Sequence, residues 1–344
     1  MLVLLLCFLP LAFAGYIPGK QCGGVVCLDD EDVQCIPQNN YCRCKDGLWG
    51  NGRFACVERS STCLCYLFGD PYITAFSGSV MAAPIPCRHI LTEFTTPSGV
   101  YVKVSATGGN RDDKDYPGFV MEDEVFFRAS KGKTTAHADI RRSGFYNKGL
   151  KVPLPVADNF PDFGLTVYGE FQSHYWRLEL PRHAVAVRYR SADSSITIQT
   201  PKGSKFVKER LCGQCSDGPG QYEKEASAMG LTKKEWSFYK QAFNLESKNE
   251  DRQVCIDFDA AVKATPKDKQ AAGLKFCGAP FSHNDIGSCF TEAFGKPNIL
   301  QKTVTCLTDF TAGKTSDWCA AGAKAKSGCS NKGVDFSVIE SQCT

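Results

Sequence analysis

The chain has 344 residues, 40 basic and 37 acidic side chains, and a formal net charge of +3 at pH 7. This length suits two or three compact modules, and 22% charged with 43% hydrophobic residues excludes a disordered tail or a low-complexity fibre. The near balance of charge creates no large basic field, so we expect no nucleic-acid partner, and it excludes a strongly acidic ion-sequestering protein. The 19 cysteines are therefore the informative residues.

Residues 1–14 predict a secretory signal peptide. They read MLVLLLCFLPLAFA, an apolar run that ends in the small-x-small pattern of a signal-peptidase site. The run is too short for a transmembrane helix, and no later stretch reaches the roughly 20 apolar residues that one needs. We expect a secreted, extracellular protein without a membrane span. Cleavage removes Cys7 and leaves 18 cysteines (19 − 1), an even number that favours disulfides in an oxidising compartment.

Residues 15–60 form the first predicted module. The segment has few strongly apolar residues, so it needs covalent crosslinks in place of a sizeable core. Its cysteines follow the spacing C-x4-C-x7-C-x6-C-x-C-x11-C and are Cys22, Cys27, Cys35, Cys42, Cys44 and Cys56. This spacing and the Gly-rich tail resemble an EGF-like domain. The resemblance implies the pairs Cys22–Cys35, Cys27–Cys42 and Cys44–Cys56, whereas spacing alone leaves many connectivities open.

Two metal-binding interpretations of this module are weaker than the disulfide-linked one. A zinc knuckle at Cys42–Cys44 would need histidines that the segment lacks, and secretion argues against it. The acidic run 29–32 could attract calcium, but calcium-binding EGF modules carry their acidic signature before the first cysteine. A solvated loop is the better interpretation.

Residues 61–222 predict an antiparallel β-sandwich. The long stretch 88–211 contains no cysteine and is large enough to bury a core of its own. Apolar and polar side chains alternate there as in half-buried strands, and turn residues separate the runs. The predicted strands are 100–104, 176–180, 184–190 and 195–200.

Four motifs in this module resemble a von Willebrand factor type D domain. They are GDPYITAFSG at 69–78, CRHIL at 87–91, GLKVPLP at 149–155 and LCGQC at 211–215. Their order and spacing make the resemblance specific, where any one motif alone would be weak. Tyr72, Ser77 and Gln214 depart from the His, Asp and Asn that are usual in this family.

The resemblance implies the disulfides Cys65–Cys215 and Cys87–Cys255. Cys63 is extra, and we predict that it pairs with Cys212. The loop that follows, which can hold calcium in this family, offers only Asp217 and Glu223 as carboxylates, too few for the oxygen ligands that calcium prefers.

Residues 223–344 predict a helical, cysteine-rich module. Aromatic residues recur at helical spacing in 232–246, where Thr232 and Glu235 fit a capping box. The segment 259–274 is also helical, although Pro266 must interrupt or start a helix. The module resembles the small disulfide-stapled C8 domain that commonly follows a D domain, and its cysteines are Cys277, Cys289, Cys306, Cys319, Cys329 and Cys343.

Catalytic motifs are weak throughout. The C-x-x-C at 212–215 resembles a thiol–disulfide oxidoreductase site, but it follows a β-rich segment rather than opening a helix, which favours structural disulfides. No catalytic motif accompanies the five histidines, His89, His137, His174, His183 and His283. His174 and His183 flank one strand, yet two ligands do not make a metal site. We expect no enzyme activity, cofactor or metal.

The basic stretch 202–210 (KGSKFVKER) could bind a sulfated polysaccharide, but a solvated face is the simpler interpretation. Together these features predict a multidomain, mainly β protein of the extracellular matrix, structural or adhesive in function. We expect it to act through assembly with other matrix or secreted proteins, or through disulfide-linked or non-covalent self-assembly. A protease inhibitor and a lipid- or lipoprotein-binding protein remain the alternatives.

Overall fold

The computed structural model divides the chain into two compact units, Met1–Ser60 and Ser61–Thr344. The boundary between the two units falls at the residue where we placed the end of the EGF-like module. Residues 61–344, which we predicted as a β module followed by a helical module, form a single unit. The structure describes residues 19–23, 25–28, 31–39, 41–51, 55–58, 61–68, 72–82, 87–109, 121–141, 144–147, 150–152, 161–162, 165–166, 168–172, 175–180, 183–190, 195–215, 220–246 and 253–343. The predicted signal peptide, with Cys7, lies outside these residues.

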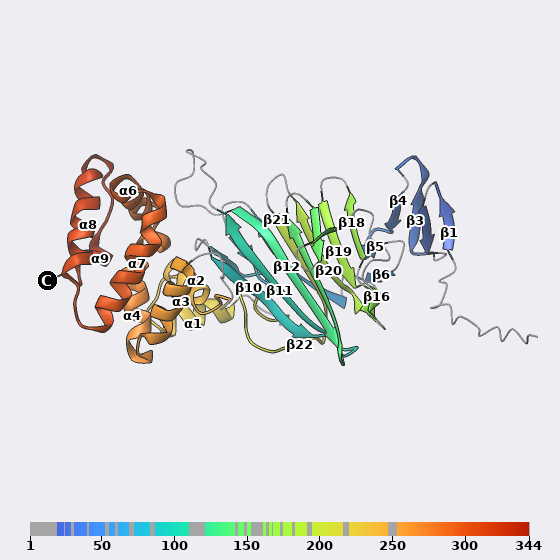
Figure 1. Cartoon of the computed structure of the whole chain (residues 1–344), viewed down its shortest axis with the longest axis horizontal. Helices are drawn as coiled ribbons and strands as arrows, with labels where there is room; N and C mark the ends of the chain where they lie inside the picture. Colours follow the sequence, from blue (N-terminus) through green and yellow to red (C-terminus); the bar gives the residue numbers. More distant parts are fainter. Residues whose placement is uncertain are drawn as a thin grey trace, which may run out of the picture. The chain divides into compact units, whose positions relative to one another are not determined.

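In its described residues, the first unit forms three two-stranded antiparallel sheets (Figure 1). Its only buried cluster is built of cysteines, with Val33 and Cys35 packed against Cys22, Cys27 and Cys42 within the described residues. Sulfur therefore replaces the apolar core that so short a segment cannot assemble. The elements are β1 (Gly19–Cys22), β2 (Val25–Leu28), β3 (Val33–Ile36), η1 (Pro37–Asn39), β4 (Tyr41–Cys44), β5 (Leu48–Asn51) and β6 (Ala55–Glu58).

Two seven-stranded sheets form the β part of the second unit. The first has the order β15 (Leu150–Val152), β14 (Gly144–Asn147), β13 (Thr134–Arg141), β12 (Met121–Lys131), β11 (Tyr101–Gly109), β10 (Arg88–Thr95) and β22 (Lys205–Phe206). The second has the order β18 (Tyr168–Gln172), β19 (Tyr175–Leu180), β20 (Val185–Arg190), β21 (Ser195–Pro201), β7 (Thr62–Phe68), β8 (Tyr72–Thr74) and β9 (Val80–Ala82). A separate hairpin joins β16 (Pro161–Asp162) to β17 (Leu165–Thr166).

The two sheets share one apolar core. Along β12, Val125, Phe127 and Ala129 are buried while the residues between them are not, which is the period-two pattern of a strand with one covered face. Leu178 and Val187 contribute to the same core from the other sheet. The strands predicted at 100–104, 176–180, 184–190 and 195–200 lie in β11, β19, β20 and β21, allowing for ends shifted by a residue or so.

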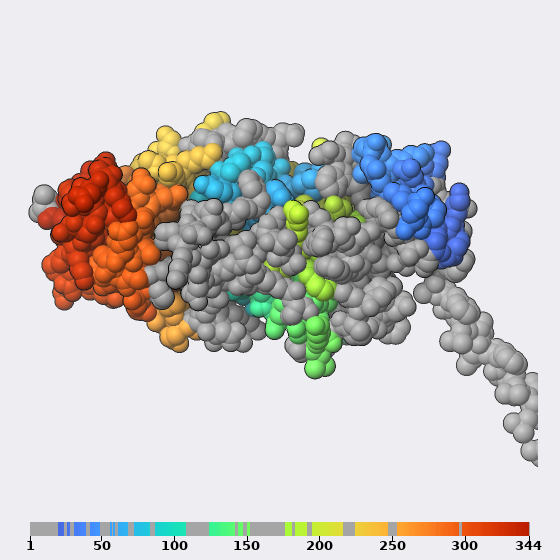
Figure 2. Space-filling model, turned by 90° about the horizontal axis from the view of Figure 1, so that it is seen from above, coloured from blue at the N-terminus to red at the C-terminus, as the bar shows by residue number. Residues whose placement is uncertain are grey.

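The helices fill the C-terminal part of the second unit, yellow to red in Figure 1 and Figure 2. They are α1 (Gly220–Ala228), α2 (Lys233–Ala242), α3 (Gln253–Ala264), α4 (Lys267–Cys277), α5 (Ala279–Ser282), α6 (Asn284–Phe294), α7 (Lys296–Thr311), α8 (Ser316–Gly328), η4 (Ser330–Lys332) and α9 (Ser337–Glu340). The predicted capping box is confirmed, because Thr232 caps α2 and Glu235 closes the box. Pro266 stands between α3 and α4, as the sequence predicts. Strands and helices are both extensive in the described residues, so the prediction of a multidomain, mainly β chain is borne out in part.

Helix α2 belongs to two cores. Its Trp236 is buried in the core of the sandwich, and its Phe238 is buried in the core of the helical part. Tyr239 packs against both. The β and helical parts are therefore continuous at this helix, which is why residues 61–344 do not separate into two units.

The chain after α2 extends one sheet. The N–H of Ile90 donates to the carbonyl of Asn244, and the N–H of Glu246 donates to the carbonyl of Arg88, each at 2.9 Å. These bonds place residues 244–246 antiparallel to the start of β10. The disulfide Cys87–Cys255 closes the same junction covalently.

Candidate functional site

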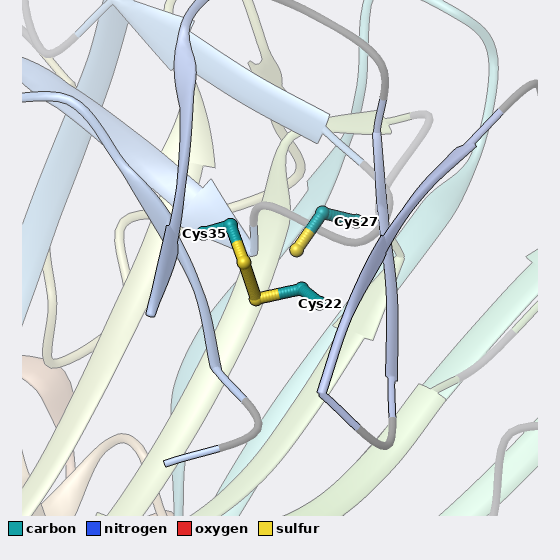
Figure 3. Close-up of side chains that lie close together, drawn as sticks. All are labelled: Cys22, Cys27 and Cys35. Carbon is teal, nitrogen blue, oxygen red and sulfur yellow. A yellow bond between two sulfur atoms is a disulfide. The ribbon is translucent and has the colours of Figure 1, made fainter. Parts of the chain in front are cut away.

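The cysteines of the first unit form three disulfides, Cys22–Cys35, Cys27–Cys42 and Cys44–Cys56. These are the pairs that the EGF-like resemblance implies. Cys22, Cys27 and Cys35 lie close enough together for their sulfur atoms to resemble a metal-binding cluster, all within 4.8 Å of one another. Figure 3 shows that two of these sulfurs are bonded to each other, and Cys27 is bonded to Cys42. Because a metal ligand must be a free thiolate, this cluster is structural.

The C-x-x-C turn at 212–215 pairs with strand β7, but with its partners exchanged from our prediction. The structure joins Cys65 to Cys212 and Cys63 to Cys215. Cys63 and Cys65 are two residues apart on a strand, so both project from the same face and depth decides the pairing. Cys65 and Cys212 are both fully buried in the sandwich core, whereas Cys63 and Cys215 are both partly exposed.

Backbone contacts explain the depth of Cys212. Its N–H donates to the carbonyl of Leu91 at 2.8 Å, and its carbonyl accepts from the N–H of Phe76 at 2.9 Å. Gly213 then adopts a φ of +66°, a left-handed conformation that turns the chain outward before Cys215. Each cysteine of the turn is thus bonded to β7 and not to the other, unlike the internal disulfide of a C-x-x-C oxidoreductase.

The remaining cysteines staple the helices. The three pairs join α4 to α7, α6 to the end of α8, and α8 to the C-terminal residues: Cys277–Cys306, Cys289–Cys329 and Cys319–Cys343. With Cys87–Cys255, which the D-domain resemblance implies, the described residues contain nine disulfides, consistent with an oxidising compartment.

The histidines are dispersed. His89 is buried on β10, and desolvation lowers its pKa to about 3 although a hydrogen bond with the Cys87 backbone opposes the shift. His137 on β13 accepts a hydrogen bond from Arg128, and His183 lies 2.6 Å from the hydroxyl of Ser98. His283 precedes α6, with its Nε2 3.7 Å from a carboxylate oxygen of Glu235. His174 lies outside the described residues, so its predicted neighbour relation to His183 stays a prediction.

The basic stretch 202–210 is partly used inside the fold. Arg210 forms an ion pair with Glu93 at 2.6 Å, and Glu209 forms one with Lys240 at 3.0 Å. Lys202, Lys205 and Lys208 are exposed. Asp217 of the predicted calcium loop lies outside the described residues, as does the side chain of Glu223.

A buried ionic cluster lies where the chain after α2 meets the first sheet. The carboxylate oxygens of Glu246 lie 2.6 Å from Arg88 Nε and 2.6 Å from Lys103 Nζ. Burial alone would raise the pKa of Glu246, but the Lys103 hydrogen bond and the charge of Arg88 outweigh it and lower the pKa. This carboxylate is held ionised between two cations and acts as a structural link.

A pocket of about 240 Å³ opens between α2, the edge strand β9 and the start of α6. Its walls combine an apolar surface with two lysines and two serines, and the lining residues are Tyr72, Val80, Met81, Ala82, Lys233, Lys234, Ser237, Phe281, Ser282 and Asn284. We call it the α2–β9 pocket. Sequence reasoning missed it because its walls come from segments some two hundred residues apart, with no local signature. Two of its wall residues, Tyr72 and Val80, are 41% and 37% exposed.

The two serines of the α2–β9 pocket differ in their hydrogen bonding. The Ser237 hydroxyl donates to the carbonyl of Lys233 at 2.8 Å. Ser282 is 3% exposed, and its hydroxyl has no hydrogen-bond partner among the described residues. Helix α6, which starts at Asn284, receives no side-chain cap. The pocket therefore holds hydrogen-bonding capacity that the described fold leaves unused.

No family model and no curated protein matches the chain. Within the described residues, no helix is both long and apolar enough to cross a membrane.

Proposed function

We propose that this chain is a secreted, non-catalytic structural or adhesive protein that works by protein–protein assembly of disulfide-stapled modules. Under this proposal the first unit is an EGF-like module, the sandwich is a D-type domain, and the helical part corresponds to a C8-like domain. The proposal rests on the sequence motifs and on the way in which the cysteines are paired.

The observation that supports the proposal most is that the disulfides lie within units and not between them. Each of the nine pairs in the described residues joins two cysteines of the same unit. Crosslinks of this kind restrict opening of each unit and preserve its surface under extracellular conditions. Cysteines used in this way contribute rigidity and not thiol chemistry.

The ends of the sheets supply a surface for assembly. β15 ends the first sheet, and its Leu150 is 75% exposed; β22 ends the other side, and Val207 just beyond it is 53% exposed. An edge strand carries unpaired backbone groups that can accept a strand of another chain. Exposed apolar side chains at both edges support a role in contacts between proteins.

Size-exclusion chromatography with light scattering tests this proposal on the full chain. We expect a mass above that of one chain that grows with protein concentration, measured with and without reductant to separate covalent from non-covalent assembly. Leu150→Lys should weaken a non-covalent assembly made at the β15 edge, while Ile256→Lys, an exposed apolar residue on α3, serves as the matched control. A monomer under both conditions that inhibits a protease stoichiometrically would refute the proposal in favour of an inhibitor.

A further inference from the structure

Several features of the α2–β9 pocket point to one kind of ligand. The apolar part of its wall comes from Tyr72, Val80, Met81 and Ala82 of the sheet edge and from Phe281 of α5. A cavity of about 240 Å³ has room for about eight water-sized groups at ~30 Å³ each. That space suits a small apolar body of about that many groups and not a drug-sized or polymeric ligand.

The polar part of the pocket favours a negative charge. Lys233 and Lys234 are exposed residues of the first turn of α2 that line the pocket, and Lys234 makes no ion pair within the described residues. Asn284 contributes the start of α6, which has no side-chain cap and whose backbone N–H groups and helix dipole attract anions. Asp285 of the same turn is exposed and is not among the lining residues. Glu235 is not among the lining residues, and its carboxylate is already engaged by the N–H of Thr232 at 2.7 Å.

Ser282 is an independent indication of a ligand. Buried hydroxyl groups without a partner are uncommon, because losing water without gaining a hydrogen bond costs about 1–3 kcal/mol. Ser282 is buried, has no partner among the described residues and lines the same cavity as the lysines. An anionic oxygen at the start of α6 would give this hydroxyl an acceptor.

We propose that the α2–β9 pocket binds a small organic anion with an apolar body, with the chemistry of a medium-chain carboxylate. The anionic group lies at the start of α6, near Ser282 and the two lysines, and the apolar body lies against β8 and β9. This inference does not rest on the proposed structural role, because a matrix protein with an empty pocket would assemble equally well.

The test uses octanoate and the full chain labelled with ¹³C at the methionine methyl groups. Met81 lines the pocket, whereas Met229 is described and is not among the lining residues, so its signal reports non-specific effects. We expect saturable shifts of the Met81 signal on titration with octanoate and at least tenfold weaker binding of 1-octanol, which has the same chain without the charge. Equal binding of both compounds, shifts confined to the other methionines, or no saturation below micelle formation would overturn the proposal.

Variants that remove the charge of the lysines provide a second test of the proposal. Lys233→Gln with Lys234→Gln should weaken octanoate binding at least tenfold, because both cations are lost. Lys267→Gln with Lys269→Gln removes the same charge from exposed positions on α4 and should leave the affinity unchanged. Ser282→Ala should weaken binding several-fold without lowering stability, since the hydroxyl is unpartnered. Equal loss in both double variants would reduce the effect to the net charge of the protein and overturn the proposal.

A vesicle experiment distinguishes an anion taken from solution from one taken from a lipid surface. Sedimentation with phosphatidylcholine vesicles, with and without phosphatidylserine, tests capture from a lipid surface. If octanoate competes with vesicle binding, the pocket takes its ligand from a membrane or particle, and if vesicles do not bind, it takes the free anion. Vesicle binding that is insensitive to octanoate and to the Lys233/Lys234 variant, in the absence of octanoate binding, would refute the pocket as the site.

Discussion

At the scale of single residues, Gly287 shows how closely the helical part is packed. A Cβ atom at this position of α6 would lie 2.3 Å from the carbonyl oxygen of Pro280, whereas one at Gly328 of α8 would meet nothing within 4 Å. We expect Gly287→Ala to lower the free energy of unfolding by about 1–3 kcal/mol. Gly328→Ala should leave it unchanged or raise it by up to about 1 kcal/mol, since alanine favours a helix. Thermal unfolding compares the two, and similar effects would contradict the close contact at Pro280.

His89 makes stability depend on pH. Its pKa is lowered to about 3 in the fold and is near 6.5 in the unfolded chain, so below pH 6.5 the unfolded state binds a proton that the folded state does not. The contribution is therefore fully present above pH 6.5 and is lost as the pH falls, by at most about 1.4 kcal/mol per pH unit.

The measurement is the difference in the pH slope of unfolding free energy between the native chain and His89→Gln. We expect the variant to have a shallower slope between pH 6.5 and about 5. The difference is needed because Glu124 and Asp139, whose pKa values are raised mainly by burial, act with the opposite sign. Imidazole ¹⁵N shifts that show His89 protonated at about pH 5 would contradict the prediction.

At the scale of elements, Glu246 links the helical part to the first sheet. Glu246→Gln removes the charge between Arg88 and Lys103 and should cost about 1–3 kcal/mol, less than for a fully buried pair because both cations are partly exposed. Glu340→Gln is the matched control, since its pair with Lys326 at 2.5 Å is half exposed, and it should cost less than about 1 kcal/mol. Urea unfolding with the disulfides intact tests both. Equal costs would show that the junction does not depend on this carboxylate.

The two disulfides between β7 and the 212–215 turn should differ in reactivity. Cys63 and Cys215 are partly exposed, and Cys65 and Cys212 are fully buried, so a thiol reductant reaches the outer pair first. Limited reduction followed by alkylation and mass spectrometry should label Cys63 and Cys215 before the other two. In denaturant the difference should vanish. Early labelling of Cys65 together with Cys215 would instead support the pairing that we predicted from the sequence.

Local patterns in the sequence predicted local structure well. Thr232 and Glu235 lie three residues apart, so the capping box of α2 follows from neighbouring positions alone. The disulfide partners of β7 depend on the depth of each cysteine in the folded core, which spacing does not encode. The α2–β9 pocket is lined by both Tyr72 and Ser282, and no short-range signal connects such distant positions. Residues 69–71 of the motif at 69–78, and residues 149 and 153–155 of the motif at 149–155, lie outside the described residues.

At the scale of the whole molecule, the β and helical parts of the second unit should unfold together. Trp236 and Phe238 of α2 are buried in different cores, and residues 244–246 pair with β10. Leu307→Ala, a fully buried change on α7, should cost about 2–5 kcal/mol. Hydrogen exchange should then show lost protection in β11 as well as in α7. Loss confined to the helices would mean that the two parts are independent domains, as the sequence alone suggested.

The bond between Cys63 and Cys215 also determines how the protein responds to being stretched. Tension applied through the ends of the second unit crosses from residue 63 to residue 215 through sulfur. The chain between these two positions, with all its strands, is bypassed by the disulfide and carries no tension. Its strands are therefore not pulled out one after another. In the proposed assembly role, the sandwich would keep its shape and its exposed edges under load while either this bond or the inner bond Cys65–Cys212 is intact.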